Sequence, residues 1–538
     1  MKNKVKRIFA IMCAAVIAFG MFGATGCSNQ TKDDINPPVN AAMSQLYVRN
    51  FNGGVGTEWL LAARKRFEEA NKNVSFEDGK TGVQIMIEQT KEVPKNISQL
   101  RAEMFFAENV NVYDFVSQGD MLEITDIVTE PLGLNGETES IEDKLSPEYK
   151  NFFKTANGKY YALPHYRSTY AITYDRDLFD EKDLFFGVDG QINQKSTGNL
   201  SNGPDGTPGT YDDGLPATYE DFYNLCSVMK RRGVNPLMWS GEHKFYTTLF
   251  CVALKTDFEG EEAKTFYTFE GTSTKLVDSI SSTGEITYQP STNITKGDGY
   301  KIYSSAGSYY ALDFLYNIIK NEYYDADALN EDTSHIDAQA DFLLSNYESK
   351  MTPIGMLIEG SWWPHESSAT FQMMESRYSN SSLKERNLAL MPYPKATADQ
   401  VGEEQTVLDT SRSAAFINAN IKESKIDLAK AFLKFLHTDE SLNEFLQYSN
   451  MTRGFEFDVN MSGLNSFAKS VVNIIQNSNV VLPMDNSDFF YKNYSTFDIE
   501  NMFVQHPVDA FKAKTTSLQL FNTAKNKFTM QTWGALFD

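Results

Sequence analysis

The sequence predicts an α/β protein built on a mainly parallel sheet and divided into two or more domains. From about residue 45 onward, short apolar strand patterns alternate with amphipathic helix patterns, which is typical of parallel strands with helices on their faces. The chain has 538 residues, 41% of them hydrophobic, which is enough for more than one sizeable core. No period of roughly 20 to 50 residues recurs, so a solenoid is not favoured.

The first βα unit is predicted just after residue 44. Gln45–Asn50 (QLYVRN) has a strand pattern, and the glycine-bearing turn Asn52–Gly56 follows it. The turn lacks the glycine spacing of dinucleotide-binding and triphosphate-binding loops, so we interpret it as a tight turn. A helix is expected after the N-cap residue Thr57, with one apolar face formed by Trp59, Leu60, Ala63 and Phe67.

Further strands and helices are predicted downstream. We expect a second strand at Val83–Glu88 (VQIMIE), a helical stretch around Ile97–Glu108 and a third strand at Val112–Val116 (VYDFV). Thr218 and Asp221 form a predicted capping pair. The later helices are expected at Thr218–Arg232, Ala306–Asn321, Ile426–Leu436 and Glu440–Ser449.

The N-terminus has the features of a secretory signal. An apolar run from Ile8 to Phe22 follows four basic residues, Lys2, Lys4, Lys6 and Arg7. At about 15 residues the run is shorter than the roughly 18 to 20 needed to cross a bilayer, so residues 1–26 are expected to be a cleaved signal peptide. Residues 24–27 (ATGC) resemble the bacterial lipobox, which implies that Cys27 carries the lipid, a palmitate-type anchor. An unlipidated secretory signal is the alternative.

A polar segment and two cysteines follow in the mature chain. Residues 27–45 contain Pro37–Pro38 and show no apolar periodicity, so we expect a lipidated flexible tether. Cys226 and Cys251 could pair outside the cell, or form two buried thiols, because both lie in apolar helix-like stretches. No cysteine and histidine pattern indicates a zinc site.

The charge balance excludes one class of partner. Residues 1–26 carry four positive charges and no negative one, so the formal net charge of −22 becomes −26 without them. Such a chain repels the phosphate backbone, and no nucleic-acid partner is expected. The aromatic content of 13% serves the cores and also suits stacking on sugar rings.

Four segments, in the same order, resemble the extracellular solute-binding proteins of carbohydrate ABC importers, the family that includes the maltose-binding protein. The GK-Y-x-x-P passage and the P-x-T-W-x-E-F helix of the family are similar to Asn157–Phe179 and Leu215–Gly233. The A-M-x-x-x-G-x-W motif and the later helix pair are similar to Gly355–His365 (GMLIEGSWWPH) and Asn418–Leu446. Together these segments are spread over most of the mature chain, from Asn157 to Leu446.

The resemblance implies a two-lobed periplasmic-binding-protein-like fold with a hinge and an inter-lobe ligand cleft. The crossings would fall near Thr169–Tyr174 and Met391–Tyr393. The chain is longer than the commonest members of the family. In this length it resembles the larger members, which take oligosaccharides. The implied division is 46–170 plus 392–456 for the first lobe, 171–391 plus 457–538 for the second, and surface insertions at about 187–214 and 255–300.

Ligand contacts are expected from both lobes, because a ligand shifts closure only by binding the closed state better. The family places a sugar-stacking tryptophan in the GSW motif, which points to Trp362, with Trp363 beside it. A core tryptophan is the alternative. Tyr246 and Phe245 fall near a second stacking position of the family.

Other candidates come from the expected hinge and from the ends of expected strands. Arg167 offers five donors, although a structural ion pair is the alternative, and Ser168 stands where the family has an acidic sugar contact. If Arg412 and Arg453 joined Arg167, an acidic sugar would be indicated. The remaining candidates are His165 and Tyr166 beside the hinge, Glu58 and Trp59 at the first helix, and Ser117 and Gln118 after the expected third strand.

The predicted surface loop at 187–214 also carries a candidate cation site. Asp205, Thr207, Asp212 and Asp213 offer the oxygen ligands that Ca²⁺ prefers, and some larger family members hold calcium near this place. The spacing is not that of an EF-hand loop, so a solvated loop is the alternative. No cofactor is required.

The expected function is therefore the substrate-binding component of an ABC importer, lipid-anchored on the outer face of the cell membrane. It would be a monomer that captures a carbohydrate, expected to be an oligosaccharide, and delivers it to the membrane permease. A surface glycan-binding lipoprotein without transport is one alternative, and a surface glycoside hydrolase or lyase is another. An enzyme is not expected, because the sequence has neither HExxH nor GxSxG.

Overall fold

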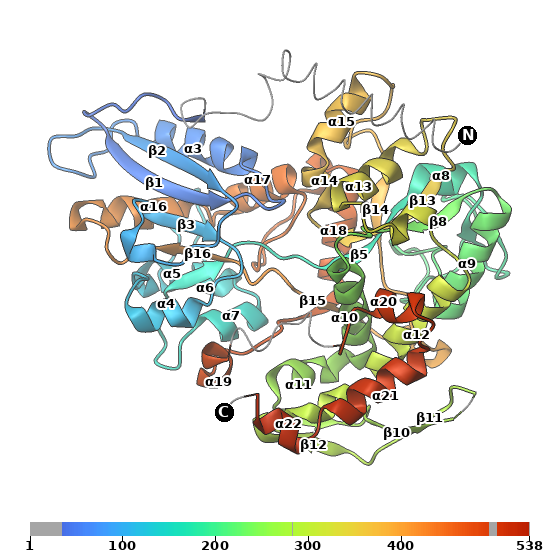
Figure 1. Cartoon of the computed structure of the whole chain (residues 1–538). Coiled ribbons are helices and arrows are strands. Elements are labelled where there is room, and N and C mark those ends of the chain that lie inside the picture. The colour runs from blue at the N-terminus through green and yellow to red at the C-terminus, as the bar shows by residue number, and fades with distance from the viewer. Residues whose placement is uncertain (1–34, 282, 494–502, 537–538) are drawn as a thin grey trace.

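The chain folds into two α/β lobes, each built on its own sheet (Figure 1). This architecture comes from a computed structural model that describes residues 35–281, 283–493 and 503–536. It confirms the predicted two-lobed periplasmic-binding-protein-like fold class. The predicted signal peptide of residues 1–26 and the predicted lipid-bearing Cys27 lie outside the described residues.

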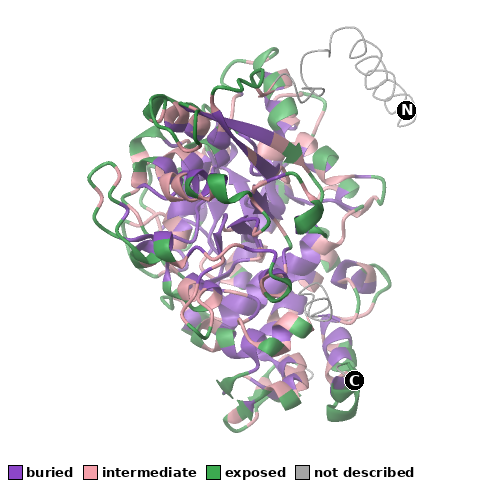
Figure 2. Ribbon diagram, turned by 90° about the vertical axis from the view of Figure 1, so that its left-hand side faces the viewer, coloured by how far each residue is buried: buried purple, intermediate pink, exposed green. Residues whose placement is uncertain are grey.

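The first lobe has a five-stranded sheet. Strand β1 pairs in parallel with β2 and β3, and β16 returns antiparallel between β3 and β4. The strands are buried on both faces (purple in Figure 2), which explains their nearly continuous apolar sequence. In spatial order they are β2 (Val83–Thr90), β1 (Ser44–Phe51), β3 (Met104–Ala107), β16 (Ala414–Ile417) and β4 (Ala162–Pro164).

Helices pack on both faces of this sheet. On α3 the buried residues are those of the predicted face, Trp59, Leu60, Ala63 and Phe67. The helices of this lobe are α3 (Glu58–Ala70), α4 (Val112–Gln118), α5 (Thr125–Thr129), α6 (Ile141–Lys144), α7 (Pro147–Phe153), α16 (Ile426–Phe435) and α17 (Asp439–Ser449).

The predicted third strand was wrong. Val112–Val116 lies in helix α4, where Asn111 accepts a hydrogen bond from the Asp114 N–H and the left-handed Gly119 ends the helix. The strand is instead β3, inside the stretch expected to be helical around Ile97–Glu108. Its four residues, MFFA, are all buried, so the alternation that identifies a half-buried strand is missing.

The second lobe has a four-stranded sheet. Strand β5 runs antiparallel between β14 and β13, and β8 adds to β13 in parallel. The capping pair predicted at Thr218 and Asp221 forms a reciprocal capping box at the start of α9. In spatial order the strands are β14 (Leu388–Met391), β5 (Tyr170–Asp175), β13 (Ile354–Gly360) and β8 (Asn235–Met238).

The helices of the second lobe surround this sheet. The central one, α10, is buried along almost its whole length. The helices are α8 (Arg176–Glu181), α9 (Tyr219–Arg231), α10 (Phe245–Glu259), α12 (Ala306–Lys320), α13 (His335–Leu344), α14 (Trp363–Glu366), α15 (Ser368–Glu375), α18 (Ser466–Gln476), α20 (Pro507–Lys512) and α21 (Ser517–Lys527).

The predicted insertions differ from plain surface loops. Residues 187–214 include part of a small hairpin, β6 (Phe185–Phe186) with β7 (Ile192–Gln194). Residues 255–300 begin inside α10 and include a separate small core with Phe266 and Phe269, because Trp533 of the C-terminal α22 packs onto them. The elements of this part are α11 (Ala263–Thr268), β9 (Gly271–Ser273), β10 (Val277–Ile280), β11 (Ile286–Tyr288), β12 (Thr292–Ile294), α19 (Asp488–Lys492) and α22 (Met530–Gly534).

The chain crosses between the lobes in segments that differ from the predicted ones. Residues 165–169 cross from β4 to β5, so the predicted Thr169–Tyr174 lies mostly within β5 itself. The predicted return at Met391–Tyr393 comes too early, because Tyr393, Val407 and Leu408 still belong to the second-lobe core. Strand β15 (Gln405–Leu408) pairs there with β17 (Ser478–Val481), and residues 409–413 then cross to β16.

Part of the predicted flexible tether is bound to the first lobe. The Asn36 side chain exchanges two hydrogen bonds with the backbone of Ile87, at 2.7 and 2.8 Å, on the free side of edge strand β2. Gln84 of the same strand holds the backbone of Asn40 and Pro38. The segment from residue 36 to 40 therefore covers a sheet edge.

The two cysteines of the second lobe do not form a disulfide bond. Cys226 and Cys251 are both free and buried, so the thiol alternative is confirmed. Burial raises the pKa of both thiols, which makes them unreactive.

Among the described residues no helix has the length and apolar character needed to cross a membrane.

Candidate functional site

The two lobes touch where the glycine turn after β1 meets the loop after β13. A Cβ atom on Gly54 would lie 2.7 Å from Cδ1 of Trp362, so only glycine allows this approach. Trp362 is half-buried and packs against the hydrophobic cores of both lobes. We refer to the residues gathered here as the inter-lobe site: Gly54, Glu58, Glu108, Tyr170, Tyr246, Gln339, Glu359, Trp362, His365 and Glu366.

Aromatic rings form one wall of the inter-lobe site. Tyr170 meets Trp362 edge to face at 5.1 Å and Tyr246 at 5.8 Å. Phe245 stacks on Tyr246 at 4.4 Å. Strand β5, the loop after β13 and the start of α10 thus form one aromatic cluster that includes three of the predicted contacts. In this arrangement Tyr170 and Tyr246 are buried, and Trp362 and Phe245 are half-buried.

Carboxylates form the other wall. The Gln339 amide donates to Glu359 at 2.7 Å and to Glu366 at 3.1 Å, so one side chain holds two acids together. Glu108, which directly follows β3 in the first lobe, interacts electrostatically with Glu366 of the second lobe. Burial raises the pKa of Glu108 to about 8, that of Glu366 to about 7 and that of Glu359 well above its usual range.

A weaker charge contact also links the lobes. The carboxylate of Glu58 lies 3.9 Å from Nε2 of His365. Burial lowers the pKa of His365, and Glu58 opposes this effect. Lys91 supplies a positive charge near Glu366 and near His335, whose pKa burial also lowers.

We expect contact between the lobes to weaken as pH rises. A carboxyl whose pKa is raised in the closed arrangement keeps its proton there, so its contribution to closure is lost as pH rises from 4.5 to about 8. His365 and His335, whose pKa values burial lowers, act in the opposite sense below pH 6.5, so the weakening is expected between pH 6.5 and 8. Small-angle scattering between pH 6.5 and 9 should show the ligand-free protein expanding over this range. Glu108→Gln should flatten the dependence, whereas the exposed Glu261→Gln, beyond the far end of α10, should not. An unchanged profile for Glu108→Gln would contradict this prediction.

Gly54→Ala should hold the lobes apart. The added methyl would collide with Trp362, and Gly54 has a φ of +113°, so closure of the ligand-free protein would cost on the order of 1.4 kcal/mol or more, equivalent to a tenfold shift of the closing equilibrium. Because a ligand stacked on the indole would replace the Gly54 contact, calorimetry should show a ligand affinity that is unchanged or raised, and small-angle scattering should show a more open ligand-free protein. Gly79→Ala is the matched control, because Gly79 has a φ of +74° and nothing within 4 Å of its added Cβ.

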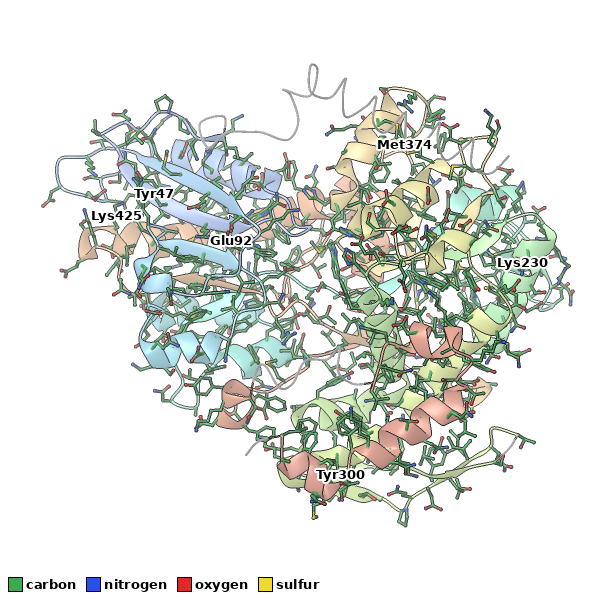
Figure 3. All side chains as sticks on the ribbon, in the orientation of Figure 1. Tyr47, Glu92, Lys230, Tyr300, Met374 and Lys425 are labelled. Carbon is green, nitrogen blue, oxygen red and sulfur yellow. The ribbon has the colours of Figure 1, made fainter. Side chains whose placement is uncertain are left out.

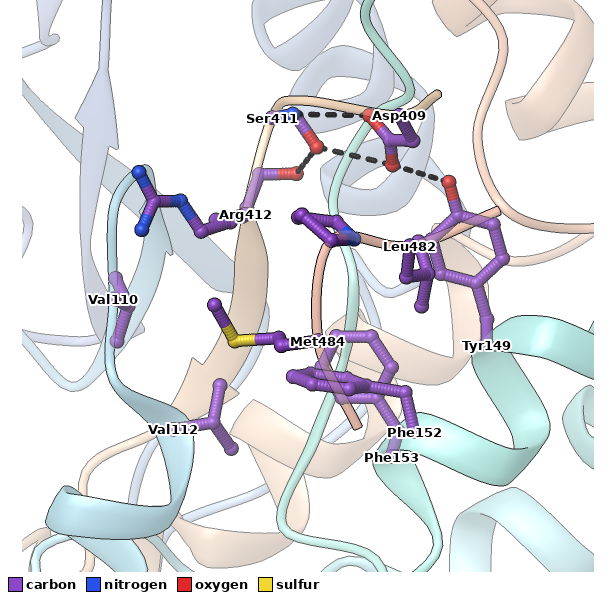
Figure 4. Close-up of a pocket in the computed structure, with 12 residues that line it drawn as sticks. Val110, Val112, Tyr149, Phe152, Phe153, Asp409, Ser411, Arg412, Leu482 and Met484 are labelled. Carbon is purple, nitrogen blue, oxygen red and sulfur yellow. Dashed lines mark hydrogen bonds between the residues drawn. The ribbon is translucent and has the colours of Figure 1, made fainter. Parts of the chain in front are cut away.

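The hinge is organised by Asp409 (Figure 4). Its carboxylate accepts from the backbone N–H of Ser168 at 2.8 Å and of Ser411 at 3.0 Å, and from the hydroxyl of Tyr149. The Ser168 hydroxyl lies 3.2 Å from that of Thr410, so it joins the two crossing segments. Ser168 is therefore placed in the hinge.

Several predicted contacts lie in the cores instead. The Trp363 indole is fully buried and donates to Thr173 Oγ1 at 2.9 Å. Trp59, His165 and Tyr166 are buried in the first lobe, where the first two rings lie 5.4 Å apart. Of the pair at the start of α3, only Glu58 faces the second lobe.

The three predicted arginines do not converge. Arg167 forms an ion pair with Glu148 at 2.8 Å and stacks on Tyr149, which matches the structural alternative. Arg412 lines a small cavity of about 30 Å³ beside the hinge, together with Val110 and Met484 (Figure 4). Arg453 lies in the first-lobe core. The basis for an acidic sugar is thereby removed.

Ser117 and Gln118 lie at the exposed end of α4. The Ser117 hydroxyl accepts a hydrogen bond from the Tyr491 hydroxyl at 2.8 Å. Helix α4 contributes no residue to the aromatic wall. The prediction of Ser117 and Gln118 depended on a third strand at Val112–Val116, which the structure replaces with β3. Glu108, which does follow β3, is the residue that the strand-end rule would have found.

The candidate calcium ligands form hydrogen bonds within their own loop. Asp212 accepts from the Asp205 N–H at 3.0 Å and Asp213 from the Gly209 N–H at 2.8 Å. The Asp205 carboxylate accepts from the Thr207 N–H at 2.7 Å. Over the part of the chain that the structure describes, no group of three or more His, Cys, Asp or Glu could hold a metal ion.

Two cations lie against one aromatic ring on the outer side of the first lobe. On the first lobe the Arg101 guanidinium lies 3.9 Å from the ring of Tyr47, and the Lys425 ammonium lies 5.3 Å from it (Figure 3). These contacts cover the outer side of β1, away from the inter-lobe site.

Known structures share the two-lobed fold. No family model and no curated protein match the sequence. A structure described as a chitin oligosaccharide binding protein aligns over 92% of this chain and 99% of its own, with a TM-score of 0.55 and 15% identity. The GacH receptor of Streptomyces glaucescens GLA.O, studied unliganded and with acarbose, aligns over 92% and 98%, with a TM-score of 0.52 and 13% identity. A protein from work on xylan utilization by Caldanaerobius polysaccharolyticus aligns over 90% and 100%, with a TM-score of 0.53 and 14% identity.

Proposed function

We propose that this chain is the extracellular substrate-binding component of an ABC importer and captures a carbohydrate at the inter-lobe site. The observation that carries the proposal is the aromatic wall of Trp362, Tyr170 and Tyr246, facing acceptors from both lobes. Proteins of the same fold described as binding chitin oligosaccharide or acarbose support a saccharide ligand.

The chemistry of the site suits a sugar. The C–H face of a pyranose ring packs on an indole, and its hydroxyls donate hydrogen bonds to carboxylates. Glu108 and Glu366 supply such acceptors from opposite lobes. A ligand that contacts both favours the closed arrangement, which is the state a membrane permease would recognise.

In this structure the two lobes are in contact at Trp362. The glycine turn lies against the indole where a sugar ring would stack, so the lobes must separate before a ligand enters. Binding is then an exchange of the Gly54 contact for ligand contacts. This exchange predicts that ligand affinity depends on how strongly the empty lobes hold together.

We further propose a monomer that is lipid-anchored through Cys27 at the outer face of the cell membrane. The ATGC motif supports the anchor. Membrane fractionation tests it, because Cys27→Ser should move the protein from the membrane fraction to the medium. A protein that stays in the medium without this substitution would instead be an unlipidated secreted binder.

Isothermal calorimetry of the mature protein against mono- and oligosaccharides tests the carbohydrate proposal. We expect a stabilising hit, and no product released from the ligand. Absence of binding to every saccharide of the panel would overturn the proposed ligand class, and product release would indicate an enzyme. Uptake of the hit by cells lacking the gene separates an importer component from a surface glycan binder.

A further inference from the structure

A group of buried side chains in the first lobe keeps nitrogen atoms without a partner among the described residues. These are Nε1 of Trp59, both ring nitrogens of His165, and Nε and Nη2 of Arg453. The three residues are only 1 to 2% exposed. Buried polar atoms in folded proteins are nearly always hydrogen-bonded, so several orphans in one place need a physical explanation.

The orphaned groups lie together around Phe445. The Arg453 guanidinium carbon is 4.2 Å from the Phe445 ring and 4.9 Å from the Trp59 ring. The His165 ring is 5.4 Å from Trp59 and 5.7 Å from Phe445. Three elements that are distant in sequence, α3, the first crossing segment and the turn after α17, thus bring these three side chains together around Phe445.

The orphan atoms of Arg453 form one complete edge of the guanidinium. Nη1 donates to the Leu436 carbonyl at 3.2 Å, which leaves Nε and Nη2 as a two-pronged fork. Such a fork fits a small anion. No carboxylate in the described part of the chain forms an ion pair with Arg453, and burial lowers its pKa to about 9.

The titratable neighbours supply no negative charge. Burial and the charge of Arg453 lower the pKa of His165 well below its usual range and that of His437 to about 3, so both are neutral at physiological pH. Lys144, near His437, is already paired with Glu137 and Asp439, so those carboxylates balance Lys144 and not Arg453. A buried cation without a counter-charge is costly, and a bound anion would remove that cost.

We propose that Arg453, Trp59 and His165 bind a small monovalent inorganic anion such as chloride inside the first lobe. The anion would accept from Nε and Nη2 of Arg453, from the Trp59 indole N–H and from the single N–H of neutral His165. The site lies directly behind the hinge. The backbone N–H of Arg167, in the first crossing, donates to the Thr452 carbonyl at 2.9 Å, one residue before Arg453.

Thermal unfolding in chloride-free gluconate buffer, with chloride added at constant ionic strength, tests this site. We expect a saturable rise in Tm of roughly 2 to 4 °C, which Arg453→Met abolishes and Arg377→Met, at an exposed position of the second lobe, retains. Wild-type crystals grown in bromide should show an anomalous peak within hydrogen-bond distance of Arg453, whether or not Arg453→Met folds. A Tm that ignores chloride, an unchanged response in Arg453→Met, or a water without anomalous signal at Arg453 would overturn the proposal.

Discussion

Trp362→Ala is expected to weaken saccharide binding at least tenfold without unfolding either lobe. The indole contributes the apolar face on which a sugar ring would pack, a contribution on the order of 1 to 3 kcal/mol for a stacked aromatic contact. Because Trp362 is only half-buried and packs against the two cores from outside, we expect both lobes to stay folded without its side chain. Calorimetry with the saccharide found in the panel gives the affinity, and circular dichroism checks the fold.

Two variants make this measurement specific. Trp362→Phe should recover part of the affinity, since a smaller ring still stacks. Tyr288→Ala removes a partly exposed aromatic residue on β11, away from the inter-lobe site, and should leave affinity unchanged. If Trp362→Ala binds as tightly as the native protein, Trp362 does not contact the ligand.

Asp175→Ala should destabilise the second lobe by about 3 to 5 kcal/mol. Its carboxylate accepts from Arg386 Nη2 and Asn346 Nδ2, both at 2.6 Å, and from the backbone N–H of Asp177 and Leu178 at the start of α8. Both ion-pair side chains are 2% exposed. The substitution therefore leaves a buried guanidinium without its partner and also removes a helix cap.

Denaturant unfolding measures this effect against a matched control. Asp488→Ala breaks an exposed ion pair with Lys492 on α19 and should change stability little. The double variant Asp175→Asn with Arg386→Met should lose less than Asp175→Ala, since it leaves no buried charge unpaired. An Asp175→Ala protein with native stability would mean that Arg386 finds another acceptor.

Local patterns predicted much of the fold. The apolar face of α3 and the capping box of α9 could be read directly, because each depends on residues three or four positions apart. Strand β3 could not, because a short run that is buried on both faces has no periodicity. That single misplacement directed attention to Ser117 instead of Glu108.

The candidate site was predictable only in part. The resemblance to the family predicts Trp362 through the GSW motif and Tyr246 through a second stacking position. Gln339 and Glu366 belong to the site because α13 and α14 pack side by side, and neither residue type is unusual on a helix. The prediction that Arg167 and Arg453 contact the ligand is not supported. A single arginine in a sequence does not indicate whether a carboxylate, as at Arg167, or aromatic rings, as at Arg453, will surround it.

The segment around Asn36 has a consequence for how the protein behaves in solution. Unsatisfied backbone groups at a sheet edge are a template on which a second chain can add a strand. Asn36 occupies two of these groups on β2 by mimicking the next strand with its amide. A shortened protein that began after residue 41 would expose that edge and lose its protection against self-association, although every residue of both lobes would still be present.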